Sequence, residues 1–228
     1  MARQPRWSVT GRPHLLRHIG HSGQPVFVDD GDRALCRDLL LAGAEQEGVA
    51  LHAYTLLAAD VWLLGTPRRE GALARWMQAL GRAYVRAFNR RHGRSGTLWD
   101  GRYRATVLAE PWVLPAMLML DAEPVRLGLA AAPEAWPWST HGHYGGLAAQ
   151  AGLTPPAAWW ALGDTPFARE ARYRQYSREG LPAAAAQRLR EAATKGWPLG
   201  DADFLAALQA ETGRRVTPAR PGRPRKRG

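Results

Sequence analysis

The sequence predicts an α+β fold, a ferredoxin-like antiparallel sheet with helices on one face, followed by a helical C-terminal extension and a basic tail. Two observations predict this fold class. Four short, partly apolar segments bounded by turn residues indicate strands, and apolar residues recur at helical spacing in the segments between them. The segments follow one another as strand–helix–strand–strand–helix–strand–helix, which is the order of a ferredoxin-like sheet.

The first three strands and the first helix are expected near the start of the chain. His14–Ser22 is short, partly apolar and closed by Gly and Ser, which indicates a first strand. Asp30–Gly48 carries leucines at helical spacing and ends at a glycine, so it is predicted to be a helix. Two strands follow, Val49–Leu57 and Val61–Thr66, joined by a short turn.

A long basic helix and a fourth strand complete the predicted sheet. Arg68–Arg91 places apolar residues on one helical face and arginines on another. Gly101–Glu110 alternates like a strand, and Pro111 then stands where the first turn of a helix tolerates proline.

Three parts of the chain differ in composition. Residues 1–150 form the predicted sheet domain. Residues 151–216 contain Pro-Pro, Trp-Trp and Ala-rich runs, which predict a small helical extension. Residues 217–228 read TPARPGRPRKRG, which has neither a core-forming pattern nor a helical period, so a disordered basic tail is expected.

The charge balance favours a nucleic-acid partner. Lys and Arg total 31 against 20 acids, a net charge of +11, and arginine greatly outnumbers lysine. Codons of a GC-rich genome explain the choice of Arg over Lys, but they do not explain the basic excess. Arginine binds phosphates through two parallel hydrogen bonds and stacks on bases, so this surface suits nucleic acid.

Several classes of protein are disfavoured. A single cysteine, Cys36, excludes an internal disulfide framework and is expected to be buried, as suits the bacterial cytosol. No apolar run is long enough to span a membrane, and the basic N-terminus lacks the apolar segment of a secretory signal. We therefore expect a bacterial cytoplasmic, nucleoid-associated protein without membrane contact.

Four segments carry a resemblance to a known family. They read VALHAYTLLAADVWLLGTP (49–67), GRAYVRAFNRRH (81–92), GTLWDGRYRATVLAE (96–110) and EPVRLGLA (123–130). Together they resemble the single-tyrosine HUH transposases of the REP-associated kind, over roughly residues 5–145 and more weakly over 195–218. The resemblance implies a ferredoxin-like fold, recognition of single-stranded or hairpin DNA, and DNA transposition. It also allows a homodimer, which no residue pattern here specifies.

The residues that carry catalysis in that family are replaced in this sequence. In the family, two histidines on one strand hold a divalent metal that polarises the scissile phosphate, and a tyrosine on a later helix attacks it. The metal-ligand positions here are Asp60 and Trp62, and the nucleophile position is Met119. Asp121 falls where relatives often carry a further metal ligand. We call these four the relic positions, and we expect no resident metal or other cofactor and no strand cleavage.

Two alternatives stay open at the level of sequence. In the first, Asp60 and Asp121 bind Mg²⁺ or Mn²⁺ and a nucleophile outside the family position attacks, giving an active metal-dependent nicking enzyme or transposase. In the second, the chain is a decaying, non-enzymatic relative with no specific DNA role. Tyr54 and Tyr84 are expected to pack in the core rather than to replace the missing tyrosine.

The histidines give only weak metal signals. His141 and His143 have an H-x-H spacing but lie among Pro, Trp, Ser and Gly in a predicted loop. His52 is expected to be a hydrogen-bonded histidine within its strand.

The residues that remain for DNA binding are mainly arginines. On the long helix they recur every three or four residues and share one sign of charge, which favours a row facing phosphates over a solvated helix face. In GRYR, Arg alternates with an aromatic residue suited to base stacking. The candidates in the sheet domain are Arg82, Arg86, Asn89, Arg90, Arg91, Arg102, Tyr103, Arg104 and Arg126. For Arg126 the sequence leaves open whether it supports the helix end or binds a phosphate.

The tail offers a separate contact with duplex DNA. A GRP core flanked by basic residues resembles an AT-hook, whose extended Arg-Pro backbone fits the narrow minor groove of A·T-rich DNA. Arg223, Arg225 and Lys226 are its candidate contacts, and a generic basic tail is the alternative.

Overall fold

The structure is a computed structural model and describes residues 6–218 of the chain. Its strands are β1 (His14–Ile19), β2 (Val49–Leu56), β3 (Asp60–Pro67) and β4 (Arg104–Val107). Its α-helices are α1 (Asp30–Glu47), α2 (Ala72–Arg91), α3 (Val113–Arg126), α4 (His141–Tyr144), α5 (Ala157–Trp160), α6 (Pro166–Glu179), α7 (Ala183–Lys195) and α8 (Ala202–Thr212). None of the helices within residues 6–218 is long and apolar enough to cross a membrane.

The four strands form one antiparallel sheet in the order β2-β3-β1-β4. Helix α1 connects β1 to β2, and α2 connects β3 to β4, which is the ferredoxin-like arrangement that the sequence predicts. The β2–β3 hairpin closes at the predicted turn, where the Leu57 N–H donates to the Asp60 carbonyl at 2.8 Å. The predicted α+β fold class is therefore confirmed.

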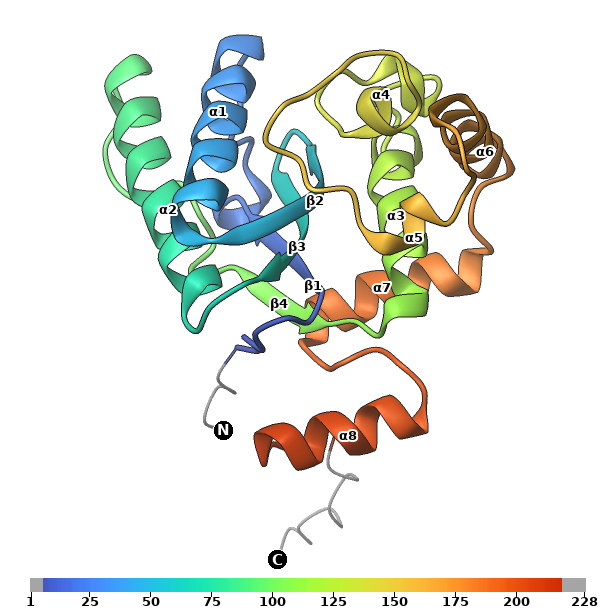
Figure 1. Cartoon of the computed structure of the whole chain (residues 1–228). Coiled ribbons are helices and arrows are strands. Elements are labelled where there is room, and N and C mark those ends of the chain that lie inside the picture. The colour runs from blue at the N-terminus through green and yellow to red at the C-terminus, as the bar shows by residue number, and fades with distance from the viewer. Residues whose placement is uncertain (1–5, 219–228) are drawn as a thin grey trace, which may run out of the picture.

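The helices cover both faces of the sheet, whereas the sequence predicts helices on one face (Figure 1). On one face, α1 and α2 pack through residues such as Leu40, Trp76 and Tyr84 against Leu16 and Leu63 of the sheet. Helices α3 and α7 pack on the opposite face, and α5 and α6 pack on α3. The second layer arises because residues on β1 and β3 alternate between two apolar surfaces, and each surface needs a cover.

The segment predicted as a separate extension shares a hydrophobic core with the sheet. Tyr173 of α6 and Leu189 of α7 are fully buried in the same cluster as Leu15, Trp62 and Met119. Helix α8 packs through Leu208 on a smaller cluster that includes residues from the N-terminal segment and β4.

Element ends differ from the predicted ones where glycines redirect the backbone. Strand β1 stops at Ile19 because Gly20 leads into a 3₁₀ turn over His21–Gly23. Helix α2 starts at Ala72, four residues later than predicted, because Gly71 adopts a left-handed conformation with φ 72°. The predicted helix over residues 30–48 is confirmed: the Asp29 side chain caps its first turn, and Gly48 at φ 71° ends it.

Candidate functional site

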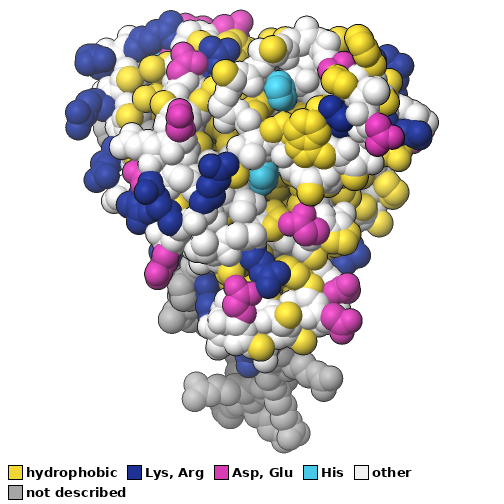
Figure 2. Space-filling model, viewed as in Figure 1, with side chains coloured by type: hydrophobic (Ala, Val, Ile, Leu, Met, Phe, Trp, Pro, Cys, Tyr) yellow, Lys and Arg dark blue, Asp and Glu magenta, His cyan; other side chains and the backbone are white. Residues whose placement is uncertain are grey.

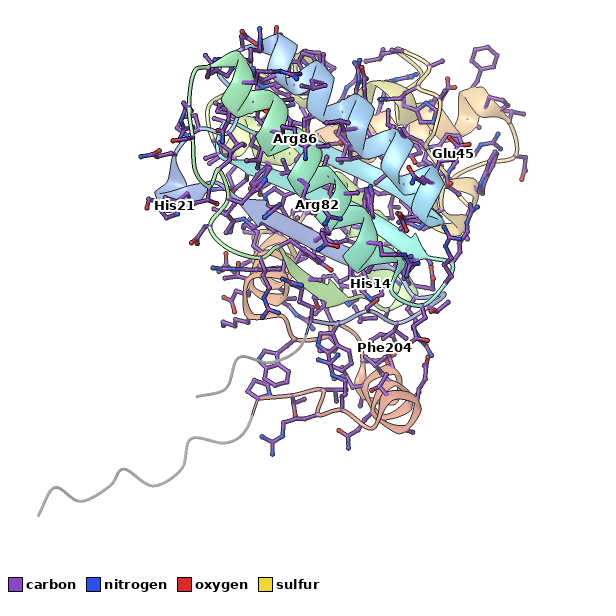
Figure 3. All side chains as sticks on the ribbon, turned by 90° about the vertical axis from the view of Figure 1, so that its left-hand side faces the viewer. His14, His21, Glu45, Arg82, Arg86 and Phe204 are labelled. Atoms are coloured by element: carbon purple, nitrogen blue, oxygen red, sulfur yellow. The ribbon has the colours of Figure 1, made fainter. Side chains whose placement is uncertain are left out.

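The exposed face of α2 carries a row of arginines. The helix buries one apolar face against the sheet, so residues four apart on the opposite side stay in solvent. Arg82, Arg86 and Arg90 occupy that side, are exposed, and make no ion pair or side-chain hydrogen bond within residues 6–218. We call these three the arginine row; Figure 3 shows Arg82 and Arg86 on the outer side of the helix.

Two other α2 residues predicted to contact DNA hold the fold together. Arg91 Nη1 lies 2.6 Å from Asp29 Oδ1 and 2.6 Å from Asp32 Oδ1, which ties the end of α2 to the start of α1. This guanidinium lowers the pKa of Asp29. The Asn89 side chain donates to the Gly96 carbonyl at 2.9 Å and shapes the loop after the helix. Neither residue belongs to the arginine row.

The GRYR segment leads into β4. Arg102 is exposed, Arg104 is half-buried, and neither makes an ion pair within the described chain. Tyr103 is only 7% exposed, and the Arg6 guanidinium lies 4.2 Å from its ring centroid. Burial raises the pKa of Tyr103. Its ring forms part of the core, with Arg6 over one face, so base stacking on that face requires Arg6 to move.

Basic side chains gather on the side of the molecule formed by α1 and α2 (Figure 2). The other half of the same view shows more apolar surface, broken by two histidines. On this face of the molecule, the basic side chains are thus unevenly distributed.

Two of the relic positions, Trp62 of β3 and Met119 of α3, are buried in one hydrophobic cluster. Trp62 and Met119 are each 1% exposed and belong to the same hydrophobic cluster. Both positions are therefore part of the apolar core between the sheet and α3. Trp offers only an N–H donor and cannot ligate a cation, and a thioether cannot form a phosphoester.

The carboxylate of Asp60 is bound by the guanidinium of Arg17. Arg17 lies directly opposite Trp62 in the β1–β3 pairing, and its Nη2 is 2.5 Å from Asp60 Oδ2. The same guanidinium lies 4.8 Å from the centroid of the Trp62 ring. A cation of the protein thus takes the place that a divalent metal would need beside this carboxylate, and these residues do not fit a metal.

Asp121 lies in a buried polar cluster on the other side of α3. The Tyr173 hydroxyl donates to Asp121 Oδ2 at 2.6 Å, and His141 Nδ1 lies 3.2 Å from the same oxygen. Burial raises the pKa of Asp121. Within residues 6–218 no group of three or more His, Cys, Asp and Glu side chains is arranged to hold a metal. The sequence missed the His141–Asp121 contact, which joins residues 20 positions apart and has no local signature.

Arg126 supports the end of its helix. Its Nη2 lies 2.6 Å from Glu123 Oε2, and Arg190 of α7 binds the other oxygen of Glu123 at 2.9 Å. Glu123 is 2% exposed, so these two cations neutralise a buried carboxylate. The structure thus places the guanidinium of Arg126 on the helix end, while its DNA contact stays a prediction.

The packing expectations for other reactive groups are confirmed. The Tyr84 hydroxyl donates to the Val26 carbonyl at 2.6 Å, and burial raises the pKa of Tyr84 far above that of a free tyrosine. Burial likewise raises the pKa of Tyr54 to about 12. His52 is hydrogen-bonded through both ring nitrogens, and Cys36 is fully buried. His141 lies in the short helix α4, where the sequence predicts a loop.

The predicted tail contacts Arg223, Arg225 and Lys226 lie outside the described residues. The AT-hook-like reading therefore stays a prediction.

Comparison with known proteins adds evidence on the fold. No family model and no curated protein matches the sequence. Among solved structures, the chain is similar to a REP-associated tyrosine transposase bound to a REP hairpin, with a TM-score of 0.51, 15% identity, and 68% of this chain and 89% of that chain covered. It is also similar to a proposed transposase from Deinococcus radiodurans R1, with a TM-score of 0.37, 23% identity, and 48% and 88% covered. The first of these likenesses shows that the chain has a transposase-like fold.

Proposed function

We propose that this protein binds single-stranded or hairpin DNA through the face formed by α2 and the GRYR segment, and that it does not cleave the DNA. The observation that supports binding is the arginine row. Its three exposed guanidinium groups lie on one helix face and have no acidic partner within the described residues. Phosphates are the anions that such a row suits, and their contacts supply most of the affinity of nucleic-acid-binding proteins.

Similarity of fold supports the choice of hairpin DNA over other polyanions. The transposase with the same fold is bound to a REP hairpin, and the sequence segments that resemble its family include the α2 helix itself. The tail would add duplex contact through Arg223, Arg225 and Lys226.

The filled relic positions support the absence of cleavage. Covalent catalysis needs a nucleophile within near-attack distance of the phosphorus. Met119 supplies none, Trp62 is in the core, and Asp60 is bound by Arg17. In the alternative in which Asp60 and Asp121 hold a metal, both carboxylates would have to leave their present partners.

The test is incubation of the purified protein with labelled hairpins from the palindromic DNA around its own gene, with Mg²⁺ and with Mn²⁺. A native gel measures binding, and a denaturing gel measures nicking and covalent adducts. We expect a shift without nicking and without an adduct. Metal-dependent nicking that disappears in Asp60→Ala would overturn the proposal in favour of an active enzyme. Absence of both shift and nicking would favour the decaying relative.

A further inference from the structure

A small cavity opens on the surface between α4 and α6. The two helices lie beside each other next to α3 (Figure 1). The cavity has a volume of about 70 Å³ and is lined by Glu134, His141, Leu147, Arg174 and Arg178. We call it the α4–α6 cavity. None of its lining residues belongs to the arginine row or to the relic positions.

The most buried side chain that lines the cavity is a histidine with one unpartnered nitrogen. His141 is 2% exposed, and its Nδ1 lies 3.2 Å from Asp121 Oδ2 and 3.4 Å from the Ser177 hydroxyl. Its Nε2 makes no hydrogen bond within the described chain. A Cβ at Gly145 would lie 3.6 Å from this nitrogen and 3.4 Å from Cγ of Arg174. The unpartnered nitrogen therefore lies close to Arg174, and a buried polar atom of this kind calls for a ligand.

The carboxylate behind the ring fixes the role of the other nitrogen. The Tyr173 hydroxyl donates to Asp121 Oδ2 at 2.6 Å, so this oxygen is an acceptor and His141 Nδ1 donates to it. In the imidazolium form both ring nitrogens are donors, and Nε2 then offers an N–H to the cavity. An anion in the cavity favours that form, because opposite charges stabilise each other.

Two arginines of α6 line the cavity beside this ring. Arg174 and Arg178 are about one helical turn apart, so their side chains lie on the same side of α6. Neither makes an ion pair within the described residues, and Arg178 is exposed. Arg174 donates to the Gly145 carbonyl, which leaves other N–H groups of its guanidinium for a second acceptor. Guanidinium and imidazolium groups bind oxyanions through charge-assisted hydrogen bonds.

One acidic side chain also lines the cavity. Glu134 is exposed, lies in the 3₁₀ turn Pro133–Ala135 and makes no ion pair within the described part of the chain. Two arginines and a histidine donor thus face a single carboxylate, and the balance favours an anion over a cation. Because like charges repel, Glu134 lowers the affinity of the cavity for an anion.

The volume restricts the ligand to a small oxyanion. The cavity has roughly the volume of two water molecules in the liquid, at about 30 Å³ each. This suits one free phosphate or sulfate ion. A phosphate within a DNA strand carries a sugar on each side, and the cavity has no room for either sugar.

These observations carry an inference that is independent of DNA binding. We propose that the α4–α6 cavity binds inorganic phosphate through His141 Nε2, Arg174 and Arg178. Asp121 does not touch the phosphate and acts as a positioning residue for the imidazole ring. Bound phosphate links α4 to α6, and so holds residues 127–156 against the helices that pack on α3.

The test is a titration of the natural protein with sodium phosphate at constant ionic strength, followed by NMR of the histidine ring nitrogens. We expect the His141 signals to shift and saturate, and chloride not to reproduce the shift. Arg178→Gln should raise the Kd for phosphate about tenfold, because one charge-assisted hydrogen bond is lost. Glu134→Gln should lower the Kd, because it removes the repelling carboxylate.

Two further variants keep charge and folding apart from binding. Arg172→Gln removes the same charge from an exposed position on α6 outside the cavity, and should leave the Kd unchanged. His141→Asn keeps an N–H near the position of Nδ1 to donate to Asp121, but it removes Nε2, and should weaken phosphate binding more than tenfold. Circular dichroism and the thermal midpoint check the fold. If His141→Asn does not fold, the exposed positions Arg178 and Glu134 decide.

The outcomes separate this inference from the proposed function. Absence of a saturable shift, or equal Kd values in Arg178→Gln and Arg172→Gln, overturns the phosphate site and leaves His141 as a structural residue. Affinity for a DNA hairpin should be the same in Arg178→Gln and in the natural protein. If Arg178→Gln weakens hairpin binding and free phosphate does not bind, the cavity takes a phosphate of DNA, so the inference fails while the proposed function stands. If phosphate binds as expected and no hairpin binds, the proposed function fails and the phosphate site stands.

Discussion

Two sets of arginines, one on each face of the sheet, differ in whether they have an acidic partner. On the α2 face, Arg82, Arg86 and Arg90 have no acidic partner within residues 6–218. On the α3 face, Arg17 and Arg126 each hold a carboxylate of the protein, at 2.5 and 2.6 Å. The arginines of the two sets carry the same charge. What distinguishes them is whether the protein already supplies the anion.

Whether an arginine already binds a carboxylate of the protein decides whether it can bind an external anion. Glu123 is 2% exposed, and a carboxylate buried to that degree costs several kcal/mol when it loses its cations, so its pair with Arg126 is committed to the fold. The Arg17–Asp60 pair is more exposed, at 25% and 14%, and contributes less. Exposed arginines give up only hydration when they bind phosphate, and counterion release favours that exchange. The arginine row is therefore free to bind an external anion, whereas Arg17 and Arg126 already hold an anion of the protein.

The largest expected effect tests whether Trp62 belongs to the apolar core between the sheet and α3. Trp62→Ala should lower the free energy of unfolding by about 3–5 kcal/mol, because it removes a buried indole and leaves a cavity. Chemical denaturation measures the change. Arg86→Ala is the matched surface control and should change stability by less than about 0.5 kcal/mol. A Trp62→Ala protein as stable as the natural one would show that the relic position is not packed as described.

The next largest effect is on hairpin binding, when the charges of the arginine row are reversed. Arg82→Glu/Arg86→Glu/Arg90→Glu should weaken hairpin binding about a hundredfold, or about 2.7 kcal/mol, because it reverses three phosphate contacts. The free energy of unfolding should change little, since none of the three has an acidic partner to lose. The control is Arg172→Glu/Arg178→Glu/Arg188→Glu, which makes the same change in net charge on α6 and α7. Equal losses in both variants would mean that net charge, and not the row, determines binding.

A smaller effect is the pH dependence of stability that His14 of the central strand β1 contributes. His14 accepts a hydrogen bond from the Val9 N–H at 3.1 Å through Nε2, while its Nδ1 donates to the Arg12 carbonyl at 2.7 Å. Burial, opposed in part by the hydrogen bond to Arg12, lowers the pKa of His14 from 6.5 to about 4. The unfolded state therefore binds more protons between these two values. The stability that the neutral ring contributes is present above pH 6.5 and is lost as the pH falls through that window.

The magnitude of this pH effect is measurable. Lowering the pH from about 7 to about 5 should cost about 2 kcal/mol through His14. His14→Gln, which keeps a donor and an acceptor, should show a smaller difference between the two pH values. Urea denaturation at each pH measures it. If the natural protein and the variant lose the same stability, His14 does not titrate as its burial implies.

The sequence predicted features that depend on neighbouring residues, and it did not predict contacts between residues far apart in the chain. Apolar spacing predicted α1, α2 and the four strands, and the order of elements predicted the sheet, because these patterns are local. The exposed position of Arg82, Arg86 and Arg90 followed from the same helical period. The partners of Arg91 could not be predicted, because Asp29 and Asp32 lie some 60 residues away and meet it only when α1 packs on α2.

The candidate site shows the same limit. The relic positions could be named from sequence, but the Arg17–Asp60 pair depends on the register of β1 against β3, which a sequence does not state. The cavity between β4 and the end of α7 depends on Lys195 and Trp197 lying beside residues 102–105, about 90 positions earlier. A basic residue in an Ala-rich helix carries no signal of that contact.

The smallest expected effect examines the cation that replaces a metal beside Asp60. A double-mutant cycle with Arg17→Met and Asp60→Asn should give a coupling free energy of about 1 kcal/mol, because both side chains are only partly exposed, at 25% and 14%. The thermal midpoint of the natural protein should not rise with Mg²⁺ or Mn²⁺, since a bound guanidinium repels a second cation at the same carboxylate. A midpoint that rises with Mn²⁺ in the natural protein, and rises more in Arg17→Met, would show that Asp60 exchanges its arginine for a metal. The α3 face would then also bind an external ion, and the contrast between the two faces would fail at this one residue.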